Sequence, residues 1–272
     1  MQKVFEITNR YIILATPLLL FSLFSSVYLV ASLNSNKIIS IICALLILIL
    51  MTSVFLAGWF KMVKLAVENP EDEEPYLIIR EFTSGVGEFF LSSMGAILIM
   101  FFMFGIIMLG TYYLGNHFIG TPNISAELLS NAMKNTAELK SFLLSLSSEQ
   151  LIMLNLWNLL IMGMLLVNYL LIFLYMPALF FKNKNPFVAF LISLKDLFSK
   201  KFFITLGVFL LIVIANSIIS IFTTVFAGNL IMHFILTLIN FYFIVLVAVT
   251  EFYYYYQNFV TVNIGKNIDI EV

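Results

Sequence analysis

Few residues in this 272-residue sequence have the types and spacing that catalysis or metal binding requires. The two histidines, His117 and His233, each lie near one end of a long apolar run, and no carboxylate run accompanies them apart from Glu127. A zinc site needs at least three protein ligands. The sequence also lacks a glycine-rich nucleotide loop and any Ser–His–Asp or Cys–His set at one depth. It therefore predicts no enzyme, no metal site and no cofactor.

Polar side chains inside the apolar runs are nearly all neutral. The candidate intramembrane polar cluster comprises Asn158, Asn168, Asn216, Asn240 and Glu251. Each amide can hydrogen-bond to a neighbouring helix for about 0.6 kcal/mol on average, so they either join helices or line a polar cavity for a substrate or a lipid headgroup. Glu251 comes about 30 Å along its run, which places its carboxylate at the cytoplasmic interface and not at mid-bilayer.

Two charged segments between apolar runs are the other candidates for function. The candidate partner-binding residues are Glu71, Asp72, Glu73, Glu74, Lys195, Lys200 and Lys201. An anionic inner leaflet repels the acids and attracts the lysines. We expect the acids to point into the cytoplasm and to meet the basic segment or a soluble partner; a solvated turn is the alternative.

The composition requires a membrane environment for these residues. Hydrophobic residues make up 62% of the chain and charged residues 11%, against about 25% charged in soluble domains. A net charge of −1 argues against nucleic acid as a partner. A helix needs about 20 apolar residues to cross the hydrocarbon core. Six runs qualify within a single membrane domain spanning 1–272: residues 11–33, 38–60, 89–114, 151–181, 203–227 and 230–254.

The distribution of Lys and Arg sets the expected orientation, because short cytoplasmic connections are enriched in both. With the N-terminus inside, the outer segments hold only Lys37, Lys134 and Lys140. The inner segments hold Lys3, Arg10, Lys61, Lys64, Arg80, Lys182, Lys184, Lys195, Lys200, Lys201 and Lys266. Both termini are expected in the cytoplasm, with the chain in the cell membrane. The long outer loop, 116–150, ends in Ser147–Gln150, whose pattern predicts a capping box.

The two cytoplasmic links share one layout, in which a proline opens an apolar-rich segment that leads into the next span. Residues 75–88 and 186–201 are each expected to form a short amphipathic helix at the membrane surface. In the second, the apolar stripe includes Phe187, Leu191 and Phe198, and the opposite face includes Ser193 and Asp196. The shared layout suggests an internal duplication of span, interfacial helix and span.

Three stretches carry a family resemblance: "LIIREFTSGVGEFFL", "PFVAFLISLKDLFSKKFFITLGVFLL" and the closing "EFYYYYQNF". The chain resembles a loose group of bacterial multipass families, which includes the membrane domain of some glycerophosphoryl diester phosphodiesterases and stand-alone relatives. Phe82, Gly85, Phe89 and Phe90 approximate an aromatic–x–x–Gly–x–x–x–aromatic–aromatic signature of that group. The resemblance implies a six-helix fold and no catalytic residues.

These observations predict an all-α, polytopic membrane helix bundle with six transmembrane helices and two cytoplasmic interfacial helices. Three functions remain open. The favoured one is a non-catalytic scaffold or accessory subunit of a membrane complex. The alternatives are the membrane-spanning subunit of an ATP-driven transporter with a separate ATPase, and a secondary transporter. The expected partners are membrane lipids and either a cytoplasmic protein, such as an ATPase, or further copies of the chain.

Overall fold

The chain forms helices that are long and apolar enough to cross a membrane. The computed structural model describes residues 2–33, 38–71, 76–121, 136–226 and 228–261, and it has no strand within them. Six candidate spans occur in this part of the chain: Ile12–Ser32, Ile39–Glu68, Leu77–Phe118, Ser148–Phe181, Phe202–Val225 and Leu230–Val260. The predicted fold class, an all-α polytopic membrane protein, is confirmed.

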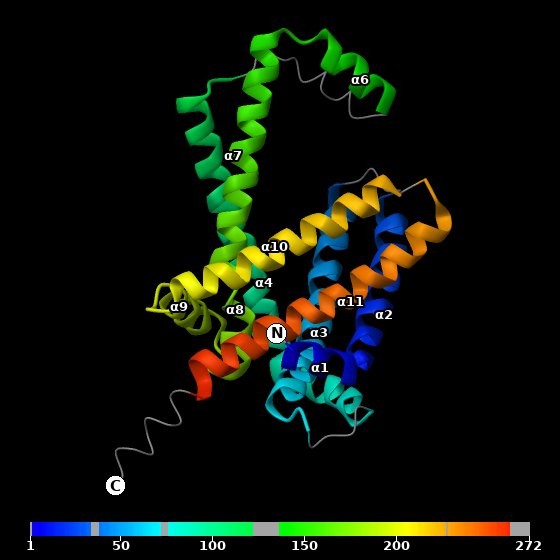
Figure 1. Cartoon of the computed structure of the whole chain (residues 1–272), viewed down its shortest axis with the longest axis vertical. Helices are drawn as coiled ribbons and strands as arrows, with labels where there is room; N and C mark the ends of the chain where they lie inside the picture. Colours follow the sequence, from blue (N-terminus) through cyan, green and yellow to red (C-terminus); the bar gives the residue numbers. More distant parts are fainter. Residues whose placement is uncertain (1, 34–37, 72–75, 122–135, 227, 262–272) are drawn as a thin grey trace. The chain divides into compact units, whose positions relative to one another are not determined.

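Figure 1 shows the helices in chain order. They are α1 (Gln2–Arg10), α2 (Ala15–Leu33), α3 (Ile38–Glu68), α4 (Glu81–Phe118), α6 (Thr136–Ser145), α7 (Ser148–Ile172), α8 (Tyr175–Phe181), α9 (Pro186–Leu197), α10 (Phe202–Val225) and α11 (Leu230–Tyr255). Short 3₁₀ turns, η1 (Ile12–Leu14) and η2 (Leu77–Arg80), precede α2 and α4. A π-helical turn, η3 (Tyr256–Val260), follows α11.

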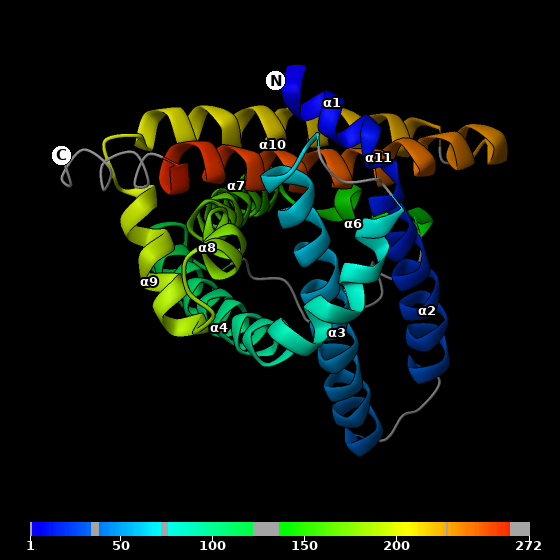
Figure 2. The same cartoon turned by 90° about the horizontal axis from the view of Figure 1, so that it is seen from below.

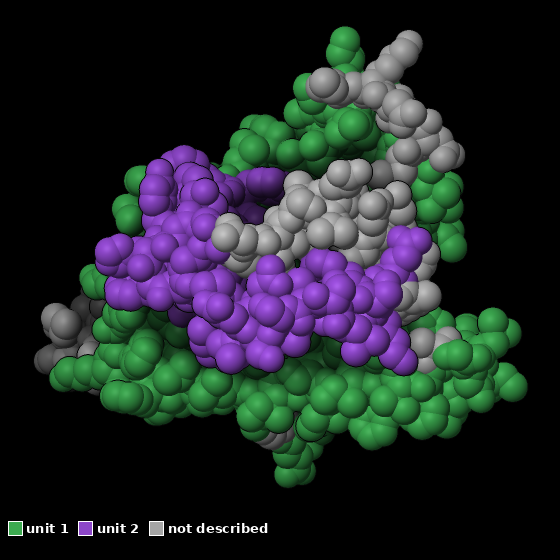
Figure 3. All heavy atoms as spheres, turned by 90° about the horizontal axis from the view of Figure 1, so that it is seen from above, with its two compact units in different colours: residues 1–100, 170–272 green, residues 101–169 purple. Residues whose placement is uncertain are grey.

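The chain divides into two compact units, which Figure 3 shows in different colours. Unit 1 comprises residues 1–100 and 170–272, and unit 2 comprises residues 101–169. In unit 1 the large buried side chains of α3, α8 and the end of α11 include Met62, Leu179, Phe252 and Tyr255. All three elements carry these residues in the halves that the sequence assigns to the cytoplasmic side. The core of unit 1 is therefore concentrated toward one end of its spans.

Unit 2 pairs the second half of α4 with most of α7 and also contains α6. The indole Nε1 of Trp157 donates to the carbonyl oxygen of Gly120 at 2.9 Å. A Cβ atom at Gly115 would lie 2.1 Å from the same indole ring, so only glycine allows this approach. The capping box before α7 is confirmed, since Ser147 N donates to Gln150 Oε1 at 3.0 Å and Gln150 N donates to Ser147 Oγ at 3.2 Å.

The fourth predicted span is broken into two helices. α7 ends at Ile172 and α8 begins at Tyr175, two residues before Pro177. A proline has no N–H to donate and its ring clashes with the carbonyl four residues earlier, which is the Phe173 carbonyl here. The break makes α8 a separate helix. This helix is buried, since every residue from Tyr175 to Phe180 is buried.

The two interfacial segments differ, contrary to the expected shared layout. Residues 77–80 form η2 and the chain then continues without a break through the long α4, so the segment 75–88 is not a separate interfacial helix. The second segment does form its own helix, α9, in which the Asn185 side chain accepts from the backbone N–H groups of Phe187 and Val188. The prediction of a separate helix is therefore correct for α9 and wrong for the first link.

The inward face of α9 combines residues of both predicted faces, since Phe190 and Leu197 of the apolar stripe are buried as well. Ser193 is fully buried and Asp196 is bonded within unit 1. Phe187, Leu191 and Phe198, by contrast, are exposed. Exposed apolar side chains are compatible with the predicted position at a membrane surface, where they would lie in lipid; that position stays a prediction.

Candidate functional site

Asp196 is the acceptor at the centre of a polar junction in unit 1. Its Oδ2 accepts from Lys182 Nζ at 2.8 Å and from the Tyr255 hydroxyl at 2.6 Å. These bonds join α9, the link that precedes it and the end of α11. The Asp196 side chain is only 14% exposed, so its carboxylate has lost most of its hydrogen bonds to water. The two donors replace those hydrogen bonds.

Lys201 extends the junction to the turn η3. Its ammonium group donates to the Asn258 backbone oxygen at 2.8 Å and to Asn258 Oδ1 at 3.1 Å. It also lies 5.5 Å from the centre of the Phe259 ring, within range of a cation–π interaction. The π-helical turn brings these Asn258 and Phe259 groups to the start of α10. We name Lys182, Asp196, Lys201, Tyr255 and Asn258 the polar junction.

A second ionic contact joins the two links directly. The Glu88 carboxylate pairs with Lys61 of α3 at 2.9 Å and with Lys184 of the second link at 2.8 Å. Glu88 is thus an acid of the first link that meets a base of the second, as the sequence suggested for the acidic run. The sequence did not indicate the contact between Glu88 and Lys184, because Glu88 is a single acid and carries no charge pattern like that of the four consecutive acids.

Aromatic rings form the apolar counterpart of these contacts. The ring of Phe180 lies 4.3 Å from Phe89 and 5.7 Å from Phe60, and Phe60 stacks on Phe252 at 5.1 Å. The four residues come from α8, α4, α3 and α11. Such pairs contribute about 0.5–1.5 kcal/mol each beyond their buried area. The rings therefore hold the ends of four helices together beside the ionic contacts.

The N-terminal segment is bonded to the same end of unit 1. The Tyr242 hydroxyl of α11 donates to Asn9 Oδ1 at 2.7 Å, and Arg10 Nη2 donates to the Glu71 backbone oxygen at 2.9 Å. The indole Nε1 of Trp59 donates to the Leu14 carbonyl at 2.8 Å. The helix α1, which the sequence did not predict separately, is thus part of the folded unit.

The candidate partner-binding residues are divided by the structure. Lys195, Lys200 and Glu71 are exposed, which suits contact with lipid or another chain. Lys201 is instead a member of the polar junction. Asp72, Glu73 and Glu74 lie outside the described residues. A role of the acidic run in partner binding stays a prediction.

The candidate intramembrane polar residues are placed on three helices of the two units. Asn158 and Asn168 belong to α7 in unit 2, and Asn168 Oδ1 is buried there without a partner among the described residues. Asn216 of α10 and Asn240 of α11 belong to unit 1 and are exposed. Glu251 is half-buried near the end of α11. Asn216 and Asn240 thus point away from the core of unit 1.

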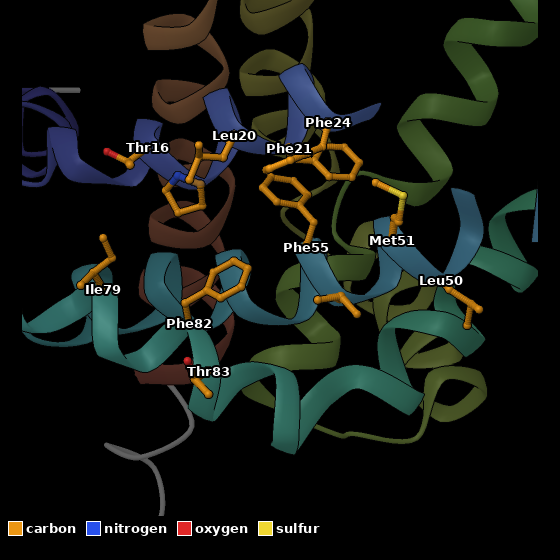
Figure 4. A pocket seen from close by; sticks show the side chains of 12 residues that line it. Thr16, Leu20, Phe21, Phe24, Leu50, Met51, Phe55, Ile79, Phe82 and Thr83 are labelled. Atoms are coloured by element: carbon orange, nitrogen blue, oxygen red, sulfur yellow. The ribbon is translucent and has the colours of Figure 1, made fainter. Parts of the chain in front are cut away.

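Unit 1 contains an apolar groove and a mixed slot. The groove has a volume of about 550 Å³ and lies between α2, α3 and the start of α4. Figure 4 shows Phe21 and Phe55 facing each other along it, with ring centres 4.3 Å apart, and Thr16 and Thr83 at one end. The slot has a volume of about 500 Å³ and lies between α1, α10 and α11. The mostly apolar lining of the groove suits an apolar chain better than a polar metabolite.

Taken together, the fold and these contacts define a multipass membrane protein. Among the described residues, no group of three or more His, Cys, Asp or Glu side chains could hold a metal ion. In comparisons with known proteins, no family model, curated protein or solved structure matches the chain. The resemblance to the phosphodiesterase membrane domains therefore stays a prediction.

Proposed function

We propose that this chain is a non-catalytic scaffold or accessory subunit of a membrane complex, and that it contacts its partner through the outer half of α10 and α11. These two helices lie side by side in Figures 1 and 2. In the half near the turn that joins them, between Ile214 and Asn240, every described side chain is exposed or only partly buried. The intramolecular core ends before this point.

The single observation that supports the proposal is a pair of unsatisfied amides in this half. Asn216 lies about 14 Å from the end of α10 at Val225, and Asn240 about 15 Å from the start of α11 at Leu230. The two are therefore level with each other, near the middle of a hydrocarbon core about 30 Å thick. Within the described part of the chain, neither amide makes a hydrogen bond.

Hydroxyl groups on the same helices make hydrogen bonds within their own helix, whereas the two amides do not. Ser217 and Thr237 donate to the carbonyls of Val213 and His233, one turn earlier, at 2.9 and 2.8 Å. An asparagine can make the same bond, as Asn258 does to the Tyr254 carbonyl at 2.9 Å, but Asn216 and Asn240 do not make it. Because lipid offers neither donor nor acceptor, an exposed Asn at this depth favours a second membrane helix as its partner.

The exposed face of α9 supports the scaffold over a transporter subunit driven by a soluble ATPase. Phe187, Leu191 and Phe198 are 61%, 52% and 66% exposed, and apolar side chains of this kind favour the acyl boundary of a bilayer. A coupling helix for a soluble ATPase would instead expose polar groups to water. The lipid environment also accounts for Lys195 and Lys200, which can reach anionic headgroups.

The test is recovery of the partner from native membranes in mild detergent, followed by mass spectrometry. The wild-type chain is expected to bring a membrane protein or further copies of itself. The double variant Asn216→Leu, Asn240→Leu should lower that recovery about tenfold, from roughly 0.6–1 kcal/mol per amide. Asn155→Leu is the matched control, because Asn155 is an exposed asparagine nearer the start of its helix, and it should change nothing.

Three results would overturn the proposal. The wild-type chain could be recovered as a monomer with lipid alone, or the double variant could retain its partner in full. A stoichiometric soluble ATPase whose recovery ignores both asparagines would favour the transporter subunit instead.

A further inference from the structure

The slot between α1, α10 and α11 has one apolar wall and one polar mouth. Its lining consists of Val4, Ile204, Gly207, Val208, Leu211, Thr250, Tyr253, Tyr254, Gln257 and Asn258. The α10 side is entirely apolar, whereas the α11 side becomes polar toward the turn η3. Figure 2 shows α1 beside these two helices.

The polarity of the slot changes along the direction of α11. Leu211 and Thr250 lie at its deeper end, and the Thr250 hydroxyl is already satisfied by the Leu246 carbonyl at 2.6 Å. Gln257 and Asn258 lie at the other end, where α10 begins and α11 ends. A ligand that fits must therefore be apolar along its length and polar at one tip.

The mouth also carries positive charge that the protein does not neutralise. The Lys201 ammonium group donates to Asn258, which lines the slot, through two bonds to neutral oxygens. Within the described residues Lys201 makes no ion pair, and the adjacent Lys200 is exposed. Lys182 differs, because Asp196 neutralises it at 2.8 Å. Lys200 and Lys201 therefore have no acidic partner within the described residues and can meet an external anion beside the slot.

We infer that the slot is a binding site for one anionic glycerophospholipid, with an acyl chain against Gly207 and Val208 and the phosphate at Lys201 and Lys200. A free phosphate ion would gain nothing from the apolar wall, and a zwitterionic lipid would bring its own cation near the lysines, which weakens their attraction to its phosphate. The inference goes beyond the proposed function, because it needs neither a partner protein nor the asparagines of the outer half.

Gly207 offers a direct way to close the site. A Cβ atom there would meet nothing within 4 Å, so a larger side chain can enter the slot without a clash. Gly207→Leu should fill the space that the acyl chain occupies. Gly105→Leu on α4 is the matched control, since a Cβ at Gly105 also meets nothing within 4 Å and Gly105 does not line the slot.

The measurement is native mass spectrometry of the full chain, released from nanodiscs that contain equal amounts of phosphatidylglycerol and phosphatidylcholine. The wild type and Gly105→Leu should each retain one phosphatidylglycerol. Gly207→Leu should lower that occupancy about tenfold, the equivalent of losing roughly two buried methylene groups. Should Gly207→Leu fail to fold, the lysine variants below test the site without changing its shape.

Lys200→Gln and Lys201→Gln keep a hydrogen-bond donor and remove the charge. Each should reduce the preference for phosphatidylglycerol over phosphatidylcholine by about fivefold, since a lysine near an anionic surface contributes about 1 kcal/mol. Equal lipid retention in wild type and Gly207→Leu, or an unchanged preference in both lysine variants, would overturn the inference. Displacement of the lipid by millimolar inorganic phosphate would also overturn it, because the site would then bind free phosphate.

Discussion

The two links at the end of unit 1 begin with similar sequences and form different structures. In the first, α4 starts directly after η2, which has no side-chain cap, and continues as one helix of 38 residues. In the second, the Asn185 side chain caps α9, which is 12 residues long and ends before α10 begins. A proline followed by apolar residues therefore does not decide between a continuous and a separate helix. The second link differs from the first in the Asn185 cap and in the contact between Asp196 and Lys182.

The first link depends on close packing, and Gly85 is where that dependence is greatest. A Cβ atom at Gly85 would lie 2.5 Å from Lys61 Cβ and 2.6 Å from the Ala57 carbonyl oxygen. Gly85→Leu must push α4 away from α3 and should lower the free energy of unfolding by about 3 kcal/mol. Thermal unfolding of the purified chain measures this.

Gly87→Leu is the matched control, because a Cβ atom at Gly87 would meet nothing within 4 Å. It adds helix propensity without a clash. If both glycine variants unfold at the wild-type temperature, α4 does not pack on α3 as described.

The second link depends on charge, and Asp196 is its central group. Asp196→Ala removes the acceptor for Lys182 and for the Tyr255 hydroxyl. Leaving both donors unpaired should lower the free energy of unfolding by about 2 kcal/mol. In the background of Tyr255→Phe the same substitution should cost less, which a double-mutant cycle measures. The exposed neighbour Lys195→Ala should leave stability unchanged, and a loss equal to that of Asp196→Ala would contradict the comparison.

Glu88 connects the two links, and its effect should be smaller. Its side chain is 31% exposed and Lys184 is 60% exposed, so solvent screens the pair. Glu88→Gln should cost about 1 kcal/mol at low ionic strength and less in high salt. Lys61 is only 16% exposed, so Lys61→Gln should account for more of this loss than Lys184→Gln. An effect of Glu88→Gln that does not change with salt would exclude the ionic explanation.

The smallest effect on stability is expected on the exposed surfaces, where a change in environment can be measured instead. After Cys43→Ser removes the chain's one cysteine, a polarity-sensitive fluorophore is attached at Leu191→Cys on α9 or at Glu71→Cys in the first link. The probe on α9 should report an apolar, lipid-quenched environment and the probe at position 71 an aqueous one. Identical spectra at the two positions would show that the links do not differ in their contact with the bilayer.

Periodicity and length were sufficient to predict the six spans and the capping box at Ser147. They were sufficient because a membrane span and a helix start each depend on residues close together in the sequence. The break before Pro177 could also have been predicted, since proline disrupts a helix interior. It was missed because the apolar run continues through it.

Contacts between distant residues could not be predicted in the same way. The pattern of α9 shows which residues share a face, but it does not indicate that Asp196 bonds to Lys182 and Tyr255. Likewise, nothing near Glu88 in the sequence indicates Lys184, and nothing near Lys201 indicates Asn258. Such pairs are set by how the helices pack, which a single sequence does not reveal.

The bond between Tyr242 and Asn9 has a consequence for biosynthesis. The segment that contains Asn9 acquires this contact only after α11 has been made, because the two positions are 233 residues apart. Each span can enter the bilayer as an independent helix before the helices pack. A nascent chain that ends after α10 therefore exposes α1 and the ends of α3 and α8 without their α11 partners. Synthesis of α11 is therefore the step that supplies these missing contacts.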